Sequence, residues 1–344
     1  MTSAALGPTG SAQSGDVVPT AGTPGPHLPR PQAGSSSQHL LTTLLGDYWA
    51  GRTEHLPSAA LVALLGEFDI GPAAARAALN RLARRGVLAS TRVGRYTYYG
   101  FAPGAAEVLM AGAYEFVSFG QGDRSWDGQW TLALFSLNER ERDLRHAVRS
   151  KLRWLGFAPL YDGTWVSSRP VAAQARHELD RLGIRDVTVF RAAEQPGSPR
   201  RPVDAWDLDE VEATYARFVT AYGPLRDQVR EGEVSAAQAL LARTRIMDSW
   251  RTFPGIDPDL PANLLPREWP RKDARTIYVE VYDALGPLAA LRVRQIVGRY
   301  TPELAEYIEY RSTDQLLGLG SQAMQRRRSP RLLPGRPTSD RTHP

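Results

Sequence analysis

Apolar side chains repeat at helical spacing over three successive segments that begin near residue 40. The first, LLTTLLGDYWA, predicts a helix with one apolar face made of Leu41, Leu44, Leu45, Tyr48 and Trp49. The second, LPSAALVALLGEF, opens with Pro57 and Ser58, residue types that favour a helix start. The third begins at Pro72, after a short turn, and Gly86 is placed to end it. We therefore predict three helices before residue 87.

After Gly86 the pattern changes from helical spacing to alternation. The segment VLASTRVGRYTYYGF predicts two strands joined by a tight turn at Val93-Gly94. Three helices followed by a hairpin of this length are typical of a winged helix-turn-helix. In that interpretation the third helix is the recognition helix and the hairpin is the wing. We assign this domain to residues 40–103, followed by a linker helix within residues 104–122.

A second alternation of strands and helices runs from residue 123 to 192. WDGQWTLALFSL predicts a strand, and NERERDLRHAVRSKLRWLG predicts an amphipathic helix. FAPLYDGTWVSS predicts two short strands, VAAQARHELDRLG a helix, and DVTVF a last strand. The order β-α-β-β-α-β is the ferredoxin-like arrangement. The sequence therefore predicts a ferredoxin-like middle domain.

The pattern becomes helical again over residues 205–322, where three long apolar-periodic segments flank the proline-rich crossing FPGIDPDLPANLLPREWP. This stretch predicts a helical C-terminal domain. Residues 1–39 are rich in Gly, Pro, Ser and Thr, and we expect them to be disordered. Residues 323–344 are expected to form a disordered basic tail. The predicted fold class is α+β: an N-terminal winged helix-turn-helix, a central ferredoxin-like domain and a helical C-terminal domain.

Charge adds a functional indication to this picture. The chain of 344 residues carries a formal net charge of only +5, so strong affinity for nucleic acid requires local clustering of basic residues. Between Asp69 and Glu107 there are six arginines and no acidic residue. A field of one sign on a helix and hairpin is suited to a DNA backbone, and Arg and Asn also read base edges. The predicted DNA-binding residues are Arg76, Asn80, Arg81, Arg84, Arg85, Arg92 and Arg95.

Several function classes lack the residues that they need. The chain has no cysteine, which excludes disulfides, thiolate zinc sites and a cysteine nucleophile. It has no phosphate-binding loop, no nucleophile elbow and no pair of histidines at chelating spacing. We therefore expect no enzyme activity, no catalytic residue, no metal and no cofactor. No apolar run approaches about 18 residues and no signal peptide is recognisable, so we expect a cytoplasmic protein without a membrane partner.

Four segments in order resemble the PaaX family of phenylacetate-catabolism repressors. They are LLGDYW with LPSAALVALLGEF, then ARAALNRLARRGVL, then WDGQW with LRWLGFAPLYDGTWVS, and finally WRTFPGIDPDLPANLLPREWP. The resemblance covers roughly residues 40–320 and implies the same three-domain organisation as the patterns above. It also implies a bacterial transcriptional repressor that binds double-stranded operator DNA as a homodimer. Release of the DNA would follow binding of an aryl-CoA such as phenylacetyl-CoA.

A place for such an effector is suggested by arginines and aromatic residues that alternate in the C-terminal region. Arginines suit the phosphates of coenzyme A, and aromatic side chains suit an aromatic acyl group. The opposite interpretation, in which the aromatic residues are core and the arginines form surface pairs, stays open. The predicted effector-binding residues are Arg243, Arg245, Trp250, Arg251, Arg267 and Trp269.

Two other functions remain as alternatives. The middle domain of the family also resembles the ferredoxin-like nuclease subunit of CRISPR adaptation complexes, which implies a metal-dependent nuclease. Such a nuclease has an aspartate at the end of its first strand. Here that place falls at about Ser136, with Asn138 and Glu139 nearby, so the carboxylate is missing. The remaining alternative is a DNA-binding protein that responds to no effector.

Overall fold

The computed structural model describes residues 36–136 and 142–328. Most of the predicted N-terminal disorder and the end of the predicted basic tail lie outside these residues. Helix α1 (Ser37–Trp49) begins earlier than the pattern predicted because the hydroxyl of Ser36 accepts a hydrogen bond from the backbone N–H of His39 at 3.3 Å. At the other end, helix α13 (Thr313–Arg328) continues into the segment that we expected to be tail.

The N-terminal elements follow the predicted order of three helices and a hairpin. After α1 come β1 (Leu56–Pro57), α2 (Ser58–Gly66), α3 (Pro72–Arg84), β2 (Leu88–Val93) and β3 (Tyr96–Phe101). The three strands form an antiparallel sheet in the order β1-β3-β2. The hairpin turn lies at Gly94-Arg95, one residue later than predicted, and Gly94 has a φ of 59°, which favours glycine. Strand β1 was not predicted, since two residues carry no alternation.

A four-stranded sheet with two helices on one face lies in the middle of the chain. Its elements are β4 (Gln129–Phe135), α5 (Arg142–Trp154), β5 (Ala158–Tyr161), β6 (Thr164–Ser167), α6 (Ala172–Arg181) and β7 (Val187–Ala193). All neighbouring strands are antiparallel, in the order β5-β6-β4-β7. Val148 and Leu152 of α5, Leu179 of α6 and Trp165 of β6 are buried together as the core of this unit. Each element occupies the segment that the sequence predicted.

The rest of the described chain is helical. It contains η1 (Pro202–Ala205), α7 (Leu208–Glu231), α8 (Ala236–Trp250), α9 (Phe253–Ile256), η2 (Ala262–Leu264), α10 (Arg271–Ala284), α11 (Gly286–Gly298), α12 (Pro302–Ala305) and α13. Helix α7 continues through Pro224. Helices α10 and α11 meet at Leu285, which caps both of them.

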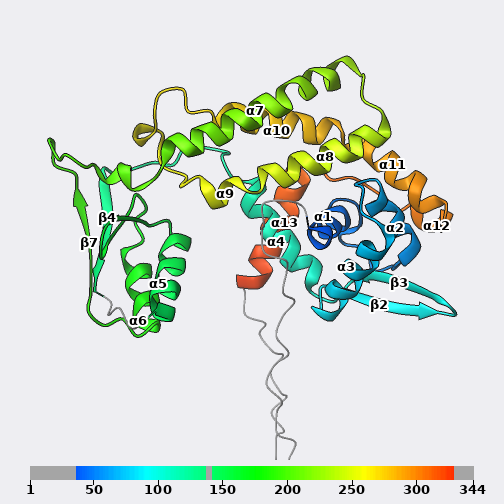
Figure 1. The fold of residues 1–344 in the computed structure, drawn as a ribbon, viewed down its shortest axis with the longest axis horizontal. Coiled ribbons are helices and arrows are strands. Elements are labelled where there is room, and N and C mark those ends of the chain that lie inside the picture. The colour runs from blue at the N-terminus through cyan, green and yellow to red at the C-terminus, as the bar shows by residue number, and fades with distance from the viewer. Residues whose placement is uncertain (1–35, 137–141, 329–344) are drawn as a thin grey trace, which may run out of the picture.

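One hydrophobic core joins the N-terminal elements to the C-terminal helices. It extends from Leu40 to Ala323 and includes helix α4 (Ala105–Val117), which packs along α13 (Figure 1). A Cβ atom on Gly320 of α13 would lie 2.6 Å from Cβ of Tyr114, so the close contact of these two helices requires glycine. The helix that we expected to be a linker is therefore part of the core.

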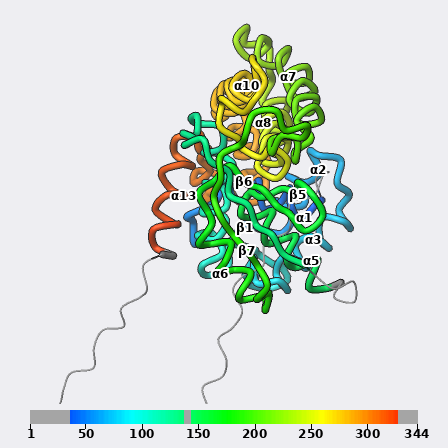
Figure 2. The backbone as a smooth tube through the Cα atoms, turned by 90° about the vertical axis from the view of Figure 1, so that its left-hand side faces the viewer, coloured from blue at the N-terminus to red at the C-terminus, as the bar shows by residue number. Residues whose placement is uncertain are grey.

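The two sheets lie at opposite ends of the molecule's long axis. Figure 1 shows the β4–β7 sheet with α5 and α6 at one end and the β2-β3 hairpin at the other, with α7, α8 and α10 between them. The turned view in Figure 2 shows α13 on one side of the molecule. The predicted α+β class, with helices and two small sheets, is confirmed. Within the described ranges, no helix is long and apolar enough to cross a bilayer.

Candidate functional site

Helix α3 has one buried face and one charged face. Gly71 precedes it and Pro72 occupies its first turn, where the missing N–H of proline costs nothing. Its inward residues, at helical spacing, are Ala75, Ala78, Leu79 and Leu82. Arg76, Asn80 and Arg84 are spaced by four residues, about one helical turn, so these three side chains share the opposite face. The small inward side chains let α3 pack closely on α1 and α2, and the arginines are left to solvent.

All seven predicted DNA-contacting residues are exposed, on α3, its C-cap and the hairpin. Among the described residues, no carboxylate forms an ion pair with Arg76, Arg81 or Arg84, and Arg85 donates to Gln38 at 3.4 Å. Arg81 and Arg84 stand in the last turn of α3, where the helix dipole favours a positive charge. The positive surface of this segment is therefore available to an anionic partner.

Asn80 is the one uncharged polar member of this face, and the hairpin fixes its orientation. Its Oδ1 atom accepts a hydrogen bond of 3.1 Å from the hydroxyl of Tyr99, on β3. The ring of Tyr99 is buried, and its backbone pairs with Leu56 of β1 and Ser90 of β2. A carbonyl oxygen has two lone pairs, so Oδ1 can still accept a second bond while the amide nitrogen donates. Asn80 is thus held by the protein and able to meet a base edge.

The tip of the hairpin carries two arginines and two exposed apolar side chains. Nε of Arg92 donates to the backbone oxygen of Gly94 at 3.2 Å, which braces the turn. Arg95 donates to the hydroxyl of Tyr96 at 2.9 Å, and its guanidinium lies 5.1 Å from the centre of that ring. The side chains of Val93 and Tyr96 are 63% and 56% exposed. A projecting hairpin of this composition can reach a groove or a phosphate.

A buried ion pair fixes α1, which supports α3, to the C-terminal helices. The guanidinium of Arg243, on α8, has no exposed surface and lies 3.3 Å from Oδ2 of Asp47 on α1. It also donates to the hydroxyl of Tyr48 at 3.0 Å and to the backbone oxygens of Tyr282 and Arg311 at 3.0 and 2.6 Å. Burial raises the pKa of Asp47, and the charge of Arg243 opposes that rise. Burial also raises the pKa of Tyr48 to about 12.

The predicted effector residues occupy different environments. Arg243 and Trp250 have no exposed surface: Arg243 is bound as described, and Trp250 stacks on Tyr278 at 4.9 Å and donates to the backbone oxygen of Phe116. We therefore assign these two side chains to the core and leave them out of the effector site. For Trp250 the interpretation as a core aromatic residue fits the structure.

The other four predicted effector residues stay predictions. Arg245 and Arg267 are exposed. Arg251 is largely buried, with an ion pair of 3.2 Å to Asp248. Trp269 is half-buried beside Tyr215, and its indole N–H is buried without a hydrogen-bond partner among the described residues.

An ionic cluster, which the sequence did not suggest, joins the middle sheet to the helices. Arg271 binds Asp257 through two hydrogen bonds of 2.8 Å and Asp259 through one of 3.3 Å. Oδ2 of Asp259 also accepts a hydrogen bond from Nε of Arg124, which precedes β4. The same oxygen lies 3.9 Å from a guanidinium nitrogen of Arg169, which follows β6. One carboxylate thus meets arginines from both parts of the molecule.

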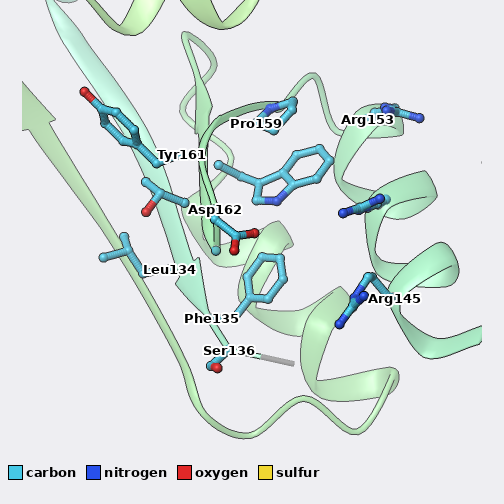
Figure 3. Close-up of a pocket in the computed structure, with 12 residues that line it drawn as sticks. Leu134, Phe135, Ser136, Arg145, Arg153, Pro159, Tyr161 and Asp162 are labelled. Carbon is cyan, nitrogen blue, oxygen red and sulfur yellow. The ribbon is translucent and has the colours of Figure 1, made fainter. Parts of the chain in front are cut away.

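The middle sheet also carries a cavity of about 800 Å³, which sequence reasoning missed (Figure 3). It is lined by one face of α5 and by residues at the ends of β4, β5 and β6. The signal was present in the sequence, because Arg145, Arg149 and Arg153 recur every four residues. Ser136, at the place of the nuclease aspartate, also lines this cavity. Asn138 and Glu139 lie outside the described residues.

Comparison with known proteins agrees with this architecture along the chain. Three protein-family models match the chain in order. The family model described as "PaaX-like protein" matches residues 36–103, and the one described as "PaaX protein central Cas2-like domain" matches residues 123–203. The family model described as "PaaX-like protein C-terminal domain" matches residues 206–294. The chain belongs to the PaaX family. The likeness to PaaX stated from the sequence motifs is thereby confirmed.

The chain is similar to two known proteins. The transcriptional repressor PaaX of Escherichia coli (strain K12) is 26% identical over 262 residues, which cover 74% of this chain and 82% of that protein. A solved structure, that of the uncharacterized protein Rv0674 from Mycobacterium tuberculosis, aligns with a TM-score of 0.49 and 19% identity. That alignment covers 76% of this chain and 98% of the other.

Proposed function

We propose that this PaaX-family chain is a transcriptional regulator that binds double-stranded operator DNA as a homodimer and releases it when an acyl-CoA binds. The observation that carries the proposal is the exposed, basic face of α3 with the adjoining hairpin. It holds six arginines in a segment without acidic residues, and all seven predicted contact residues are exposed. The relationship to a transcriptional repressor supports the same function. We take the regulation to be repression.

The arrangement of the N-terminal elements supports a winged helix-turn-helix. Three helices pack beside an antiparallel sheet in the order β1-β3-β2, with α3 before the hairpin. In such a domain α3 enters the major groove, and the hairpin contacts the backbone or the minor groove. In the middle of the chain, the element order and the strand order β5-β6-β4-β7 support a ferredoxin-like domain.

Contacts in the major groove and contacts with phosphates have different consequences. Arginine pairs with guanine through two hydrogen bonds, and asparagine pairs in the same way with adenine. We assign Arg76, Asn80 and Arg84 to base edges because they share the outward line of α3. We assign Arg92 and Arg95 of the hairpin to phosphates or to the minor groove. Arg81 and Arg85, beside that line, are assigned to phosphates.

A homodimer with two-fold symmetry requires a pseudo-palindromic operator with half-sites about 10 bp apart, or a multiple of that distance. Selection from the protein's own genomic DNA, followed by footprinting of the bound fragments, tests this proposal. We expect two protected half-sites related by symmetry, and a sedimentation coefficient of the free protein that corresponds to two chains. Protection of one unsymmetrical site by one chain would contradict the dimer.

The effector is tested by titrating the protein–operator complex with phenylacetyl-CoA and other acyl-CoA esters. By linkage, an ester that lowers operator affinity must bind less well to the DNA complex by the same factor, and a coupling of about 1–3 kcal/mol is usual. Release by an aryl-CoA supports the proposal. If operator binding is unaffected by every ester, the protein is an effector-independent DNA binder.

The nuclease alternative requires a separate assay. Ser136 stands where the nucleases have an aspartate, and the described residues contain no group of three His, Asp or Glu side chains close enough to hold a metal. We therefore propose no enzyme activity. Incubation of operator and random duplexes with the protein and Mg²⁺ should leave both DNAs intact. Cleavage that disappears in EDTA would support the nuclease instead.

A further inference from the structure

Three arginines line one wall of the cavity in the middle sheet unit. Arg145, Arg149 and Arg153 are spaced by four residues along α5, so successive side chains lie about 6 Å apart on one face. The buried face of the same helix carries Val148 and Leu152, both without exposed surface. Packing of those two residues against the sheet therefore directs the arginines into the cavity. Figure 3 shows Arg145 and Arg153 on the helix that lies across the cavity from the strands.

The basic side chains of α5 differ according to the side on which they lie. Lys151 points toward α6, where it forms an ion pair of 3.2 Å with Glu178. Arg149 and Arg153 are exposed, and no carboxylate among the described residues pairs with either. The positive charge of Lys151 is thus paired within the protein, whereas no described carboxylate pairs with Arg149 or Arg153.

The opposite wall of the cavity is largely apolar and partly flat. It consists of Leu134, Phe135, Pro159, Tyr161 and Trp165. The ring of Tyr161 is 52% exposed, and the guanidinium of Arg200 lies 5.3 Å from its centre, which adds a positive charge at the rim.

The lining also includes one acidic residue, Asp162. Its single charge opposes those of Arg149 and Arg153, so these three residues leave the cavity with an excess of positive charge. A cavity of about 800 Å³ lies within the range of about 300–1,000 Å³ that small-molecule sites occupy.

We infer that this cavity binds a small ligand that carries at least two phosphate groups and an apolar or aromatic part. Arginine binds phosphate through paired, charge-assisted hydrogen bonds, and the apolar wall provides a surface for the remainder of the ligand. Coenzyme A and its thioesters belong to this chemical class. The inference rests on the proposed function in one respect: it places the phosphates of the proposed acyl-CoA effector in this cavity and not at the predicted residues Arg245, Arg251 and Arg267.

DNA is the less suitable occupant. The cavity is a recess between one helix and the ends of short strands, and it lies at the end of the molecule opposite to the hairpin of the proposed DNA interface (Figure 1). A recess closes around a small ligand, whereas duplex DNA requires a long continuous surface.

Calorimetry of the full-length protein with free coenzyme A, and separately with inorganic pyrophosphate, tests this inference. The variant Arg149→Ala/Arg153→Ala should raise the Kd for coenzyme A at least about tenfold, since two charge-assisted contacts are lost. The matched control is Arg181→Ala/Arg185→Ala, which removes two exposed arginines of the same sheet unit that do not line the cavity. The control should bind coenzyme A like the wild type. Pyrophosphate should bind weakly and show the same dependence on Arg149 and Arg153.

Operator binding by the same preparations separates the possible failures. If wild-type protein binds DNA but neither coenzyme A nor pyrophosphate at concentrations up to about 1 mM, the cavity inference is wrong and DNA binding stands. If coenzyme A binds equally well to both double variants, its phosphates bind elsewhere and the cavity inference is wrong. If Arg149→Ala/Arg153→Ala weakens operator binding and leaves coenzyme A binding unchanged, the arginines serve DNA, which also overturns the inference.

Discussion

The hydroxyl of Tyr99 donates a hydrogen bond to Oδ1 of Asn80 at 3.1 Å. This bond joins the second strand of the hairpin to the exposed face of α3. The two elements of the proposed DNA interface are thus connected through a residue that is itself proposed to read a base. Because the ring of Tyr99 is buried in the N-terminal core, the bond holds the Asn80 side chain in place before DNA arrives.

Tyr99→Phe removes this bond and keeps the ring. We expect operator affinity to fall by about 0.5–1.5 kcal/mol, the usual net value of one hydrogen bond, because Asn80 must then be ordered during binding. Discrimination at the base pair that Asn80 contacts should fall as well. Fluorescence anisotropy with operator duplexes altered at single positions measures both. The matched control is Tyr98→Phe, whose hydroxyl has no partner among the described residues. Equal affinity and discrimination in the two variants would contradict this role for Tyr99.

Arg92→Ala/Arg95→Ala tests the hairpin. If both side chains contact phosphates, the slope of log K against log salt concentration should become less negative by about 0.9 for each lost contact. The affinity for operator and for random DNA should then fall by the same factor, because phosphates carry no sequence information. Titrations at several KCl concentrations measure the slope. An unchanged slope would show that the hairpin does not touch the backbone.

Arg243→Met tests the buried ion pair between α8 and α1. Removal of one partner leaves the Asp47 carboxylate buried without its counter-charge, so we expect the free energy of unfolding to fall by about 3–5 kcal/mol. Urea unfolding followed by circular dichroism measures it. Arg245→Met, an exposed arginine two residues away on the same helix, should change stability little. A loss in Arg243→Met no greater than in the control would mean that the pair contributes nothing.

The spacing of apolar residues along the chain predicted most of the helices and strands. The spacing of Ala75, Ala78, Leu79 and Leu82 assigned the inner face of α3, and therefore also left its arginines outside. The strands and helices of the middle unit were placed in the same way, since each has its own period. The hairpin turn lies one residue later than predicted. Strand β1 was not predicted, because a strand of two residues is too short to show alternation.

The spacing of apolar residues could not predict contacts between segments that are distant in the chain. Arg243 and Asp47 are 196 residues apart in the chain, and nothing near either residue marks it as part of a buried pair. An arginine beside aromatic residues has the same local signature in a ligand site and in a core. For this reason Arg243 and Trp250 were assigned to the effector site, although both are buried. The arginines of α5 were visible as a period, but the apolar wall opposite them is formed by strands that only the fold brings near.

The central claim is that the exposed face of α3 reads operator DNA, and the variant Arg76→Ala/Arg84→Ala tests it most directly. Its control is Arg217→Ala/Arg230→Ala, which removes two exposed arginines of α7 and so lowers the net charge equally. Operator affinity and random-duplex affinity are measured at one salt concentration. We predict that the α3 variant loses about 1–3 kcal/mol for each bidentate base contact on the operator and loses less on random DNA, while the control keeps both affinities. Operator binding by the α3 variant at the level of wild type would contradict the account.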